Sequence, residues 1–414
     1  MLARQTLNNS IKAVFRSLSH RFFALLWSGQ TISRLGDSLY RIALAWWVLE
    51  KTGSALIMGT VEIFSTVPML VFLLIGGVVV DRFNRARLML ASDLLRGIVV
   101  AIVAGLAVSR QLEVWHIFVA STIFGIVDAF FQPAYTSIVP DLTPREALPS
   151  ANSLTSLSGQ AAGIVGPALG AAVIALGGTP IAFVFDALSF FISAACLIPL
   201  LQVPAPRSDR AEPSSMMRDL REGIGTVLGS PWLWITISIA ALANIFTSSS
   251  IGIALPFLVK GKLHGDVHSL GWVYSALALG TALGTIWLGR YSKLRRRGLV
   301  AYGGWIIDGL MIAIMGLSGS VLLAALAAIV CGATSATFGL IWTNSLQELV
   351  PHEQLGRVSS IDFLGSFALM PIGFGIIGWA TDQIGAPLIF VICGVLTVGL
   401  AALGLTHPAI RNLD

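Results

Sequence analysis

Two long apolar runs flank the hydrophilic stretch Gly77-Val78-Val79-Val80-Asp81-Arg82-Phe83-Asn84-Arg85-Ala86-Arg87, which holds one acid and three arginines. The apolar runs cover residues 54–80 and 88–109. A transmembrane helix needs roughly 20 predominantly apolar residues, and both runs reach that length. The stretch therefore predicts a tight polar loop between two membrane-spanning helices.

The rest of the chain has the composition of a membrane protein. Only 11% of its residues are charged and 55% are hydrophobic, which excludes an ordinary soluble domain. The apolar runs are continuous, whereas the strands of a membrane barrel alternate apolar and polar residues. We therefore predict an all-α membrane protein with twelve transmembrane helices. The expected spans are 22–49, 54–80, 88–109, 114–139, 150–176, 180–203, 231–258, 268–290, 298–318, 321–349, 356–380 and 387–407.

The distribution of basic residues predicts the orientation of these spans. With both termini in the cytoplasm, 19 of the 26 Lys and Arg residues fall in cytoplasmic loops and tails, and four fall on the other side. This is the bias expected of cytoplasmic loops. The formal net charge of +5 is then explained by topology and by contact with anionic lipid, without a nucleic-acid partner.

One long polar segment, 204–230, divides the chain. We predict an N-terminal six-helix bundle at 1–203, a cytoplasmic linker at 204–230 and a C-terminal six-helix bundle at 231–414. Within the linker, residues 216–223 are expected to form a short amphipathic helix on the membrane surface. The halves resemble weak repeats, since Gly77 aligns with Gly289 and the arginine loop aligns with a second basic loop near Lys293. Paired six-helix halves are a recurring transporter plan.

Two motifs then indicate a family. The Gly77–Arg87 loop resembles the signature between helices 2 and 3 of the major facilitator superfamily, with Asn84 in place of a usual glycine. The fifth predicted span resembles the antiporter motif of that superfamily through Gly163, Gly166, Pro167 and Gly170.

The opening segment, from Gln30 to Ala55, is similar to the branch that holds macrolide-efflux proteins and the enterobactin exporter. The resemblance implies export by alternating access, coupled to protons. Asp128 stands in the fourth span, where many drug–proton antiporters carry an arginine.

Charged residues inside predicted spans are functional candidates because each costs several kcal/mol unless it is paired or hydrated. The candidates for proton coupling are Arg34, Asp37, Arg41, Glu62 and Asp128. Arg34 and Asp37 form a structural ion pair in one interpretation, and Arg41 is expected to pair with Glu62. In the other interpretation a carboxyl exchanges a proton as the cavity changes sides, with Glu62 preferred and Asp128 next.

Further charges have a structural interpretation. Asp93 and Arg96, spaced i, i+3, are expected to pair, and together with Asp186 and Asp362 they are interpreted mainly as helix-end and gate scaffolding. Asp308 lies near the middle of the ninth span, and no role is assigned to it.

A cytoplasmic gate is predicted from Gly77, Asp81, Arg82, Arg85, Gly356 and Arg357. In the fold that the resemblance implies, Asp81 is expected to face the N-terminus of the helix that begins near Gly356, where backbone N–H groups favour a carboxylate. Arg85 and Arg357 are expected to complete the charge cluster. The alternative is that the loop arginines only bind lipid phosphate, which we favour for Arg87. Gly163, Gly166 and Gly170 are expected to let the fifth span pack closely against a neighbour.

The substrate cavity is expected to be apolar and aromatic with few polar groups. Its predicted lining residues are Trp46, Phe64, Phe131, Asn244, Phe246, Tyr274, Trp342, Asn344 and Phe363. Such a surface suits hydrophobic or amphipathic ligands.

We therefore expect a secondary exporter of drugs, macrolides, siderophores or metabolites, multi-pass in a bacterial inner membrane. It is expected to act as a monomer, with protons as its second substrate and without metal or cofactor. A lipid flippase and a transport-inactive membrane sensor are the alternatives, and no enzyme motif occurs in the sequence.

Overall fold

The computed structural model describes residues 15–203, 216–290 and 295–414 of the chain. The side chains of 74–82, 216–220 and 352 lie outside that description. Three predicted gate residues, Gly77, Asp81 and Arg82, fall in this group, and most of the predicted linker falls in 204–215. The latch proposed for them stays a prediction.

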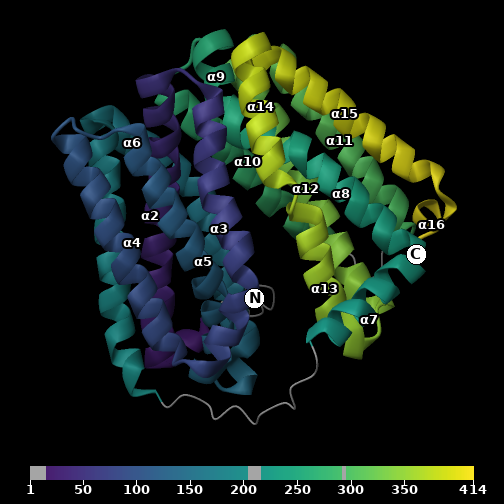
Figure 1. Ribbon diagram of the computed structural model, residues 1–414, viewed down its shortest axis with the longest axis horizontal. Coiled ribbons are helices and arrows are strands. Elements are labelled where there is room, and N and C mark those ends of the chain that lie inside the picture. The colour runs from purple at the N-terminus through teal and green to yellow at the C-terminus, as the bar shows by residue number, and fades with distance from the viewer. Residues whose placement is uncertain (1–14, 204–215, 291–294) are drawn as a thin grey trace, which may run out of the picture. The chain divides into compact units, whose positions relative to one another are not determined.

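All the secondary structure in the described residues is helical (Figure 1), which confirms the predicted class. The long helices are α2 (Arg21–Thr52), α3 (Ala55–Arg82), α4 (Arg85–Val108), α5 (Val114–Leu142), α6 (Leu148–Leu197), α8 (Pro231–Ser249), α10 (Val267–Leu288), α11 (Arg297–Leu317), α12 (Val321–Leu349), α13 (His352–Phe367), α14 (Met370–Ile384) and α15 (Ala386–Thr406). The shorter helices are α7 (Met216–Gly229) near the linker, α9 (Leu255–Phe257) between α8 and α10, and α16 (Pro408–Arg411) near the C-terminus.

Ten helical stretches of the described chain are long and apolar enough to cross a membrane. Helix α2 is not among them, although it has 32 residues, because Arg34, Asp37 and Arg41 interrupt its apolar run. Helix α6 contains Gly178 with φ 77° and ψ 172°, a left-handed position that breaks the helix where two predicted spans meet. The count of twelve spans remains a prediction.

The chain divides into two compact units by its internal contacts. Unit 1 holds residues 1–47 and 64–209, and unit 2 holds residues 48–63 and 210–414. The hairpin at 48–63, which joins α2 to α3, therefore belongs with the second unit by its contacts, although it lies inside the predicted N-terminal bundle. The predicted division at 204–230 stays a prediction.

Unit 1 is built around α4, which packs against α5 and α6. Its buried core includes Phe23 and Leu26 of α2, Met89 of α4 and Phe131 of α5, all at most 5% exposed. Lipid tails are as apolar as the helix surfaces, so the hydrophobic effect contributes little to the association of membrane helices. Close packing and hydrogen bonds between the helices hold them together instead. The polar network described below lies among these helices.

Unit 2 relies on small residues where its helices cross. Gly280 of α10 lies against the carbonyl of Ile329, and Gly332 of α12 lies against the carbonyl of Leu277. A Cβ at either glycine would come within 2 Å of that oxygen, so only glycine permits the α10–α12 contact. Helix α11 packs against α12 and α15 (Figure 1).

Candidate functional site

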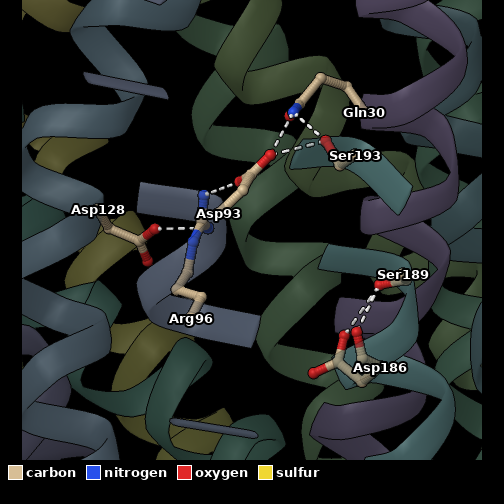
Figure 2. Close-up of polar contacts among 7 residues, drawn as sticks. All are labelled: Gln30, Asp93, Arg96, Asp128, Asp186, Ser189 and Ser193. Atoms are coloured by element: carbon tan, nitrogen blue, oxygen red, sulfur yellow. Dashed lines mark hydrogen bonds and ion pairs between the residues drawn. The ribbon is translucent and has the colours of Figure 1, made fainter. Parts of the chain in front are cut away.

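A buried arginine on α4 is shared by two carboxylates of unit 1 (Figure 2). Arg96 is 5% exposed, and its Nη2 lies 3.0 Å from Oδ1 of Asp93, one helical turn earlier. Its Nη1 lies 3.2 Å from Oδ1 of Asp128 on α5. The planar guanidinium presents its donors in a fork, so one arginine can bind both acids at once. The predicted pairing of Asp93 with Arg96 is confirmed.

The second oxygen of Asp93 is held by α2 and α6. Oδ2 accepts a hydrogen bond of 2.7 Å from Ser193 Oγ and one of 3.3 Å from Gln30 Nε2. Gln30 also donates to Ser193 Oγ at 2.8 Å, which closes a small ring of polar groups (Figure 2). Asp93 is fully buried, and these donors offset much of the cost of keeping a carboxyl group away from water.

Aromatic rings of unit 1 enclose the Arg96 guanidinium. Its central carbon lies 4.2 Å from the ring centre of Phe131 and 4.9 Å from that of Phe190. The faces of these rings attract a cation. Arg96 Nε is buried without a hydrogen-bond partner in the described chain, so the two Nη groups carry all the polar contacts of this side chain. Phe131 contacts this network, and its predicted place in the cavity lining stays a prediction.

The two acids bound by Arg96 differ in the exposure of their side chains. The side chain of Asp93 is 0% exposed, whereas that of Asp128 is 33% exposed. Asp128 is therefore the more exposed carboxyl of this pair. Protonation of Asp128 would neutralise one of the two carboxylates that contact Arg96 and leave the contact with Asp93 in place.

A further buried acid lies on α6, beside the network. Asp186 is 0% exposed, and Ser189 Oγ donates to its Oδ1 at 3.4 Å, while its Oδ2 has no hydrogen-bond partner among the described residues. Gly36 of α2 makes room for this group, since a Cβ there would lie 2.6 Å from Asp186 Oδ1. Asp37, the next residue of α2, is half-buried.

The predicted arginines of α2 have other partners than expected. Arg34 Nη1 donates to the carbonyl of Thr155 at 3.0 Å, and its guanidinium lies 5.2 Å from the ring centre of Tyr135. Both Arg34 and Asp37 lie in the described chain, and no ion pair joins them. The predicted structural pair is thus wrong, because the longer arginine reaches across to α6 instead.

The second predicted pair, Arg41–Glu62, stays a prediction because the two residues belong to different units. Arg41 is exposed, and its Nη2 donates to Ser38 Oγ at 3.4 Å. Glu62 is half-buried in the hairpin that belongs to unit 2. Its role as a proton carrier also stays a prediction.

The described gate residues bind acids that the sequence analysis did not single out. Arg85 Nη1 lies 2.5 Å from Oδ2 of Asp141 at the end of α5 and also donates to the Ser137 carbonyl at 3.1 Å. Arg357 Nη1 lies 2.6 Å from Oε2 of Glu222 on α7. Arg85 and Arg357 therefore each form an ion pair with an acid of their own unit. Gly356, beside Arg357, has open space around its Cα.

The glycines of the predicted antiporter motif face α2. A Cβ on Gly166 would lie 2.3 Å from the Ser38 Cβ, and one on Gly170 would lie 3.2 Å from the Leu39 Cα. Ser38 Oγ donates to the carbonyl of Ala162 at 3.2 Å, one turn before Gly166. Pro167 is buried beside them and Gly163 is half-buried. The motif thus positions α2, which carries Gln30 and Asp37.

Two predicted cavity residues meet in a second polar network, in unit 2. Trp342 Nε1 donates to Asp362 Oδ2 at 2.9 Å, and Ser366 Oγ donates to Oδ1 of the same carboxyl at 3.3 Å. Asn244 Nδ2 donates to the Ser366 carbonyl at 3.0 Å. Asp362 was interpreted as scaffolding from the sequence, and the structure surrounds it with neutral donors.

The remaining predicted cavity residues are dispersed over both units. Phe64 stacks on Phe118 with ring centres 4.9 Å apart, and Phe363 lies 5.0 Å from Phe367. Tyr274 donates its hydroxyl to the Ile251 carbonyl at 3.0 Å. Trp46 is buried, Phe246 is half-buried and Asn344 is exposed. The cavity predicted from them stays a prediction.

Asp382 of α14 caps the N-terminus of α3, a contact that the sequence analysis missed. Its Oδ1 accepts from the Ala55 backbone N–H at 2.6 Å, and its Oδ2 accepts from the Leu56 N–H at 3.1 Å and from Ser54 Oγ at 2.6 Å. A carboxylate is favoured at this position because the first N–H groups of a helix have no partner within it. All four residues belong to unit 2.

Comparison with known proteins shows the family to which the chain belongs. A family model described as "Transmembrane secretion effector" matches residues 12–414. The chain belongs to this family of major facilitator superfamily transporters, which are not enzymes.

Among its relatives, macrolide efflux protein A of Streptococcus pyogenes is 25% identical over 95% of this chain and 97% of that protein. The multidrug efflux pump Tap of Mycolicibacterium fortuitum is 28% identical over 92% and 94%. The enterobactin exporter EntS of Escherichia coli O81 is 26% identical over 83% and 81%.

Solved structures support the fold. A bacterial homologue of the iron transporter ferroportin, in an inward-facing state, matches with a TM-score of 0.70 at 15% identity over 94% of this chain and 99% of that one. A bacterial homologue of the human lysosomal transporter Spinster matches with a TM-score of 0.71 at 15% identity over 95% and 98%. At these identities the likeness concerns the fold alone.

Proposed function

We propose that the protein exports hydrophobic or amphipathic small molecules from the cytoplasm by alternating access, in exchange for protons. Export is supported by the relatives, which are named as efflux pumps and exporters. The proposal includes twelve spans with both termini in the cytoplasm of a bacterial cell, and a monomer in the inner membrane. The driving force is the proton gradient, without a bound cofactor.

The observation that carries the proton coupling is the single Arg96 between two acids of unequal exposure. When Asp128 is ionised, Arg96 divides its charge between Asp128 and Asp93. When Asp128 takes up a proton, that contact becomes a weaker hydrogen bond, and Asp93 is the one ionised carboxylate that still binds the guanidinium. A proton at Asp128 thereby changes the force between α4 and α5, which is the type of two-state element that alternating access requires.

Glu62 remains a second candidate for the proton, because it is a half-buried acid in a helix that is long and apolar enough to span. The two candidates act in different units, so single and paired substitutions separate them. An exporter with both carboxyls replaced by amides should have lost its response to the pH gradient.

The test is efflux from proteoliposomes under an imposed pH gradient, with a macrolide, a cationic dye and a catecholate siderophore as ligands. We expect Asp128→Asn to remove the acceleration by the gradient while ligand binding persists. Asp266→Asn is the matched control, because it changes an exposed acid in a loop to a residue that also caps helices. Gradient-driven export by the Glu62→Gln/Asp128→Asn variant at the wild-type rate would refute both assignments.

A further inference from the structure

A pocket of unit 2 lies between α10, α11 and α12. Its volume is about 520 Å³, within the range of small-molecule sites. Its walls include Trp287 at the end of α10, Leu299 and Gly303 in the first two turns of α11, and Thr334 of α12. The pocket therefore lies close to the ends of these helices that flank residues 289–296.

The surface of the pocket offers a ligand little besides apolar contact. Trp287 is 50% exposed and Ile307 is 44% exposed, so bulky apolar groups stand open at its walls. The hydroxyl of Thr337 donates to the Ala333 carbonyl at 2.8 Å, and that of Thr334 donates to Asp308 Oδ1 at 3.3 Å. Both hydroxyls in the pocket are thus already bound within the protein, and the space suits a hydrocarbon chain rather than ordered water.

Positive charge gathers at the end of the pocket where α10 stops and α11 starts. Arg290 follows Trp287 by three residues, and Arg295 and Arg296 precede Leu299. All three are exposed, and none forms an ion pair with a described residue. The next arginine, Arg297, is already paired with Glu348, with Nη2 2.5 Å from Oε2.

Two acidic side chains, Glu348 and Asp414, lie near this end and reduce its positive charge without cancelling it, because four arginines stand there. Glu348 is bound to Arg297, and the carboxylate of Asp414 accepts a hydrogen bond from the backbone N–H of Arg296. The Arg296 backbone is left-handed, with φ 57°, so this bond holds the residue in an unusual conformation just before α11 begins. Arginine side chains bind phosphate through paired hydrogen bonds, and basic residues near a membrane surface attract anionic lipid.

From this juxtaposition we infer a binding site for one anionic phospholipid. One acyl chain occupies the apolar pocket between α10, α11 and α12, and the phosphate and headgroup contact Arg290, Arg295 and Arg296. The charge of the arginines selects anionic over zwitterionic headgroups. Because the pocket joins three helices of unit 2, a bound lipid would stabilise their packing.

The test is native mass spectrometry of the full-length protein in a nonionic detergent, titrated with phosphatidylglycerol or with phosphatidylcholine of identical acyl chains. We expect one tightly bound phosphatidylglycerol and clearly weaker phosphatidylcholine. Replacing the three arginines with Gln should reduce the affinity for phosphatidylglycerol by about fivefold for each arginine and leave that for phosphatidylcholine unchanged. Equal binding of the two lipids by the wild type would overturn the proposal.

The acyl-chain pocket has its own matched pair of variants. Gly303 has no atom near its Cβ position, so Gly303→Leu places a side chain in the pocket without a backbone clash. Gly399 of α15 is equally open and does not line the pocket, so Gly399→Leu is the control. We expect Gly303→Leu to lose the bound lipid and Gly399→Leu to keep it. Unchanged binding in a folded Gly303→Leu protein contradicts the site, and the arginine variant tests it independently if Gly303→Leu does not fold.

Discussion

Replacing Arg96 with Gln should destabilise the protein far more than replacing Asp128, the exposed partner of the network. The substitution leaves Asp93 fully buried without a cation, and breaking a buried pair on one side typically costs about 3–5 kcal/mol. It also removes the contacts of the guanidinium with two aromatic rings, which adds about 0.5–2 kcal/mol. The hydrogen bonds from Gln30 and Ser193 remain and reduce the loss, so we expect a net change of about 4 kcal/mol.

Asp128→Asn provides the contrast. Its carboxylate is one-third exposed, and Arg96 retains its partner Asp93, so the expected loss is at most about 1 kcal/mol. Asp93→Asn should fall between the two, because Arg96 then depends on Asp128 alone. The double variant Asp93→Asn/Arg96→Gln removes both buried charges, and it should be more stable than Arg96→Gln by about 1–3 kcal/mol.

The assay is reversible unfolding of the purified protein in mixed micelles by increasing mole fractions of SDS, followed by the loss of helical circular dichroism. The wild type, Arg96→Gln, Asp93→Asn and the double variant form a double-mutant cycle. Asp128→Asn is measured beside them as the reference for an exposed partner. A loss below about 1 kcal/mol for Arg96→Gln would contradict the view that Asp93 is a buried charge held by Arg96. So would a double variant that is simply additive.

Three further outcomes follow from local geometry. Gly166→Ala should cost about 1–3 kcal/mol of stability through its clash with Ser38, whereas Gly105→Ala, which meets no atom, should be neutral or slightly stabilising; SDS unfolding compares the two directly. Asp382→Ala should cost about 1 kcal/mol because the first N–H groups of α3 lose their acceptor, and a thermal melt that matches the wild type would contradict this cap. The backbone N–H of Ser269 lowers the pKa of Asp266 below its usual value, so its stabilisation is complete above the unfolded pKa of about 3.9 and is lost as the pH falls toward the folded pKa. Melting temperatures between pH 6 and pH 3 should accordingly fall less for Asp266→Asn than for the wild type, and equal slopes would refute the assignment.

Local patterns of the sequence predicted the local features of the structure. Continuous apolar runs predicted helices, and the helical class is confirmed. The i, i+3 spacing of Asp93 and Arg96 predicted a pair on one helix face, and that pair forms. Each of these depends on residues less than one helix apart, where periodicity alone fixes which side chains meet.

The contacts that define the site could not be predicted in the same way. Asp128 lies 32 residues from Arg96, and Ser193 lies 100 residues from Asp93, so only helix packing brings them together. The predicted Arg34–Asp37 ion pair failed for the same reason. Arg34 donates to the carbonyl of Thr155, 121 residues away, and not to Asp37 on the same helix face. Spacing shows which residues can meet within a helix, and it carries no information about which helix lies opposite.

The buried acids of the two units have different partners, and this difference favours unit 1 as the place of the proposed proton coupling. The offset that aligns Gly77 with Gly289 also places Asp308 at the position of Arg96. Asp308 is 2% exposed, and in the described chain its carboxyl is bound by the hydroxyls of Thr334 and Ser335, without a cation.

A carboxyl among hydroxyl donors changes its surroundings little when a proton arrives, because the same hydroxyls can donate or accept. In unit 1 the corresponding place holds a guanidinium, whose charged contact with Asp128 becomes a weaker hydrogen bond when that carboxyl is protonated. A gain or loss of charge there must change how α4 is held against α5. A proton at Asp308 would leave the helices of unit 2 in place. A proton at Asp128 would weaken the attraction between Asp128 and Arg96 and so change how α5 is held against α4.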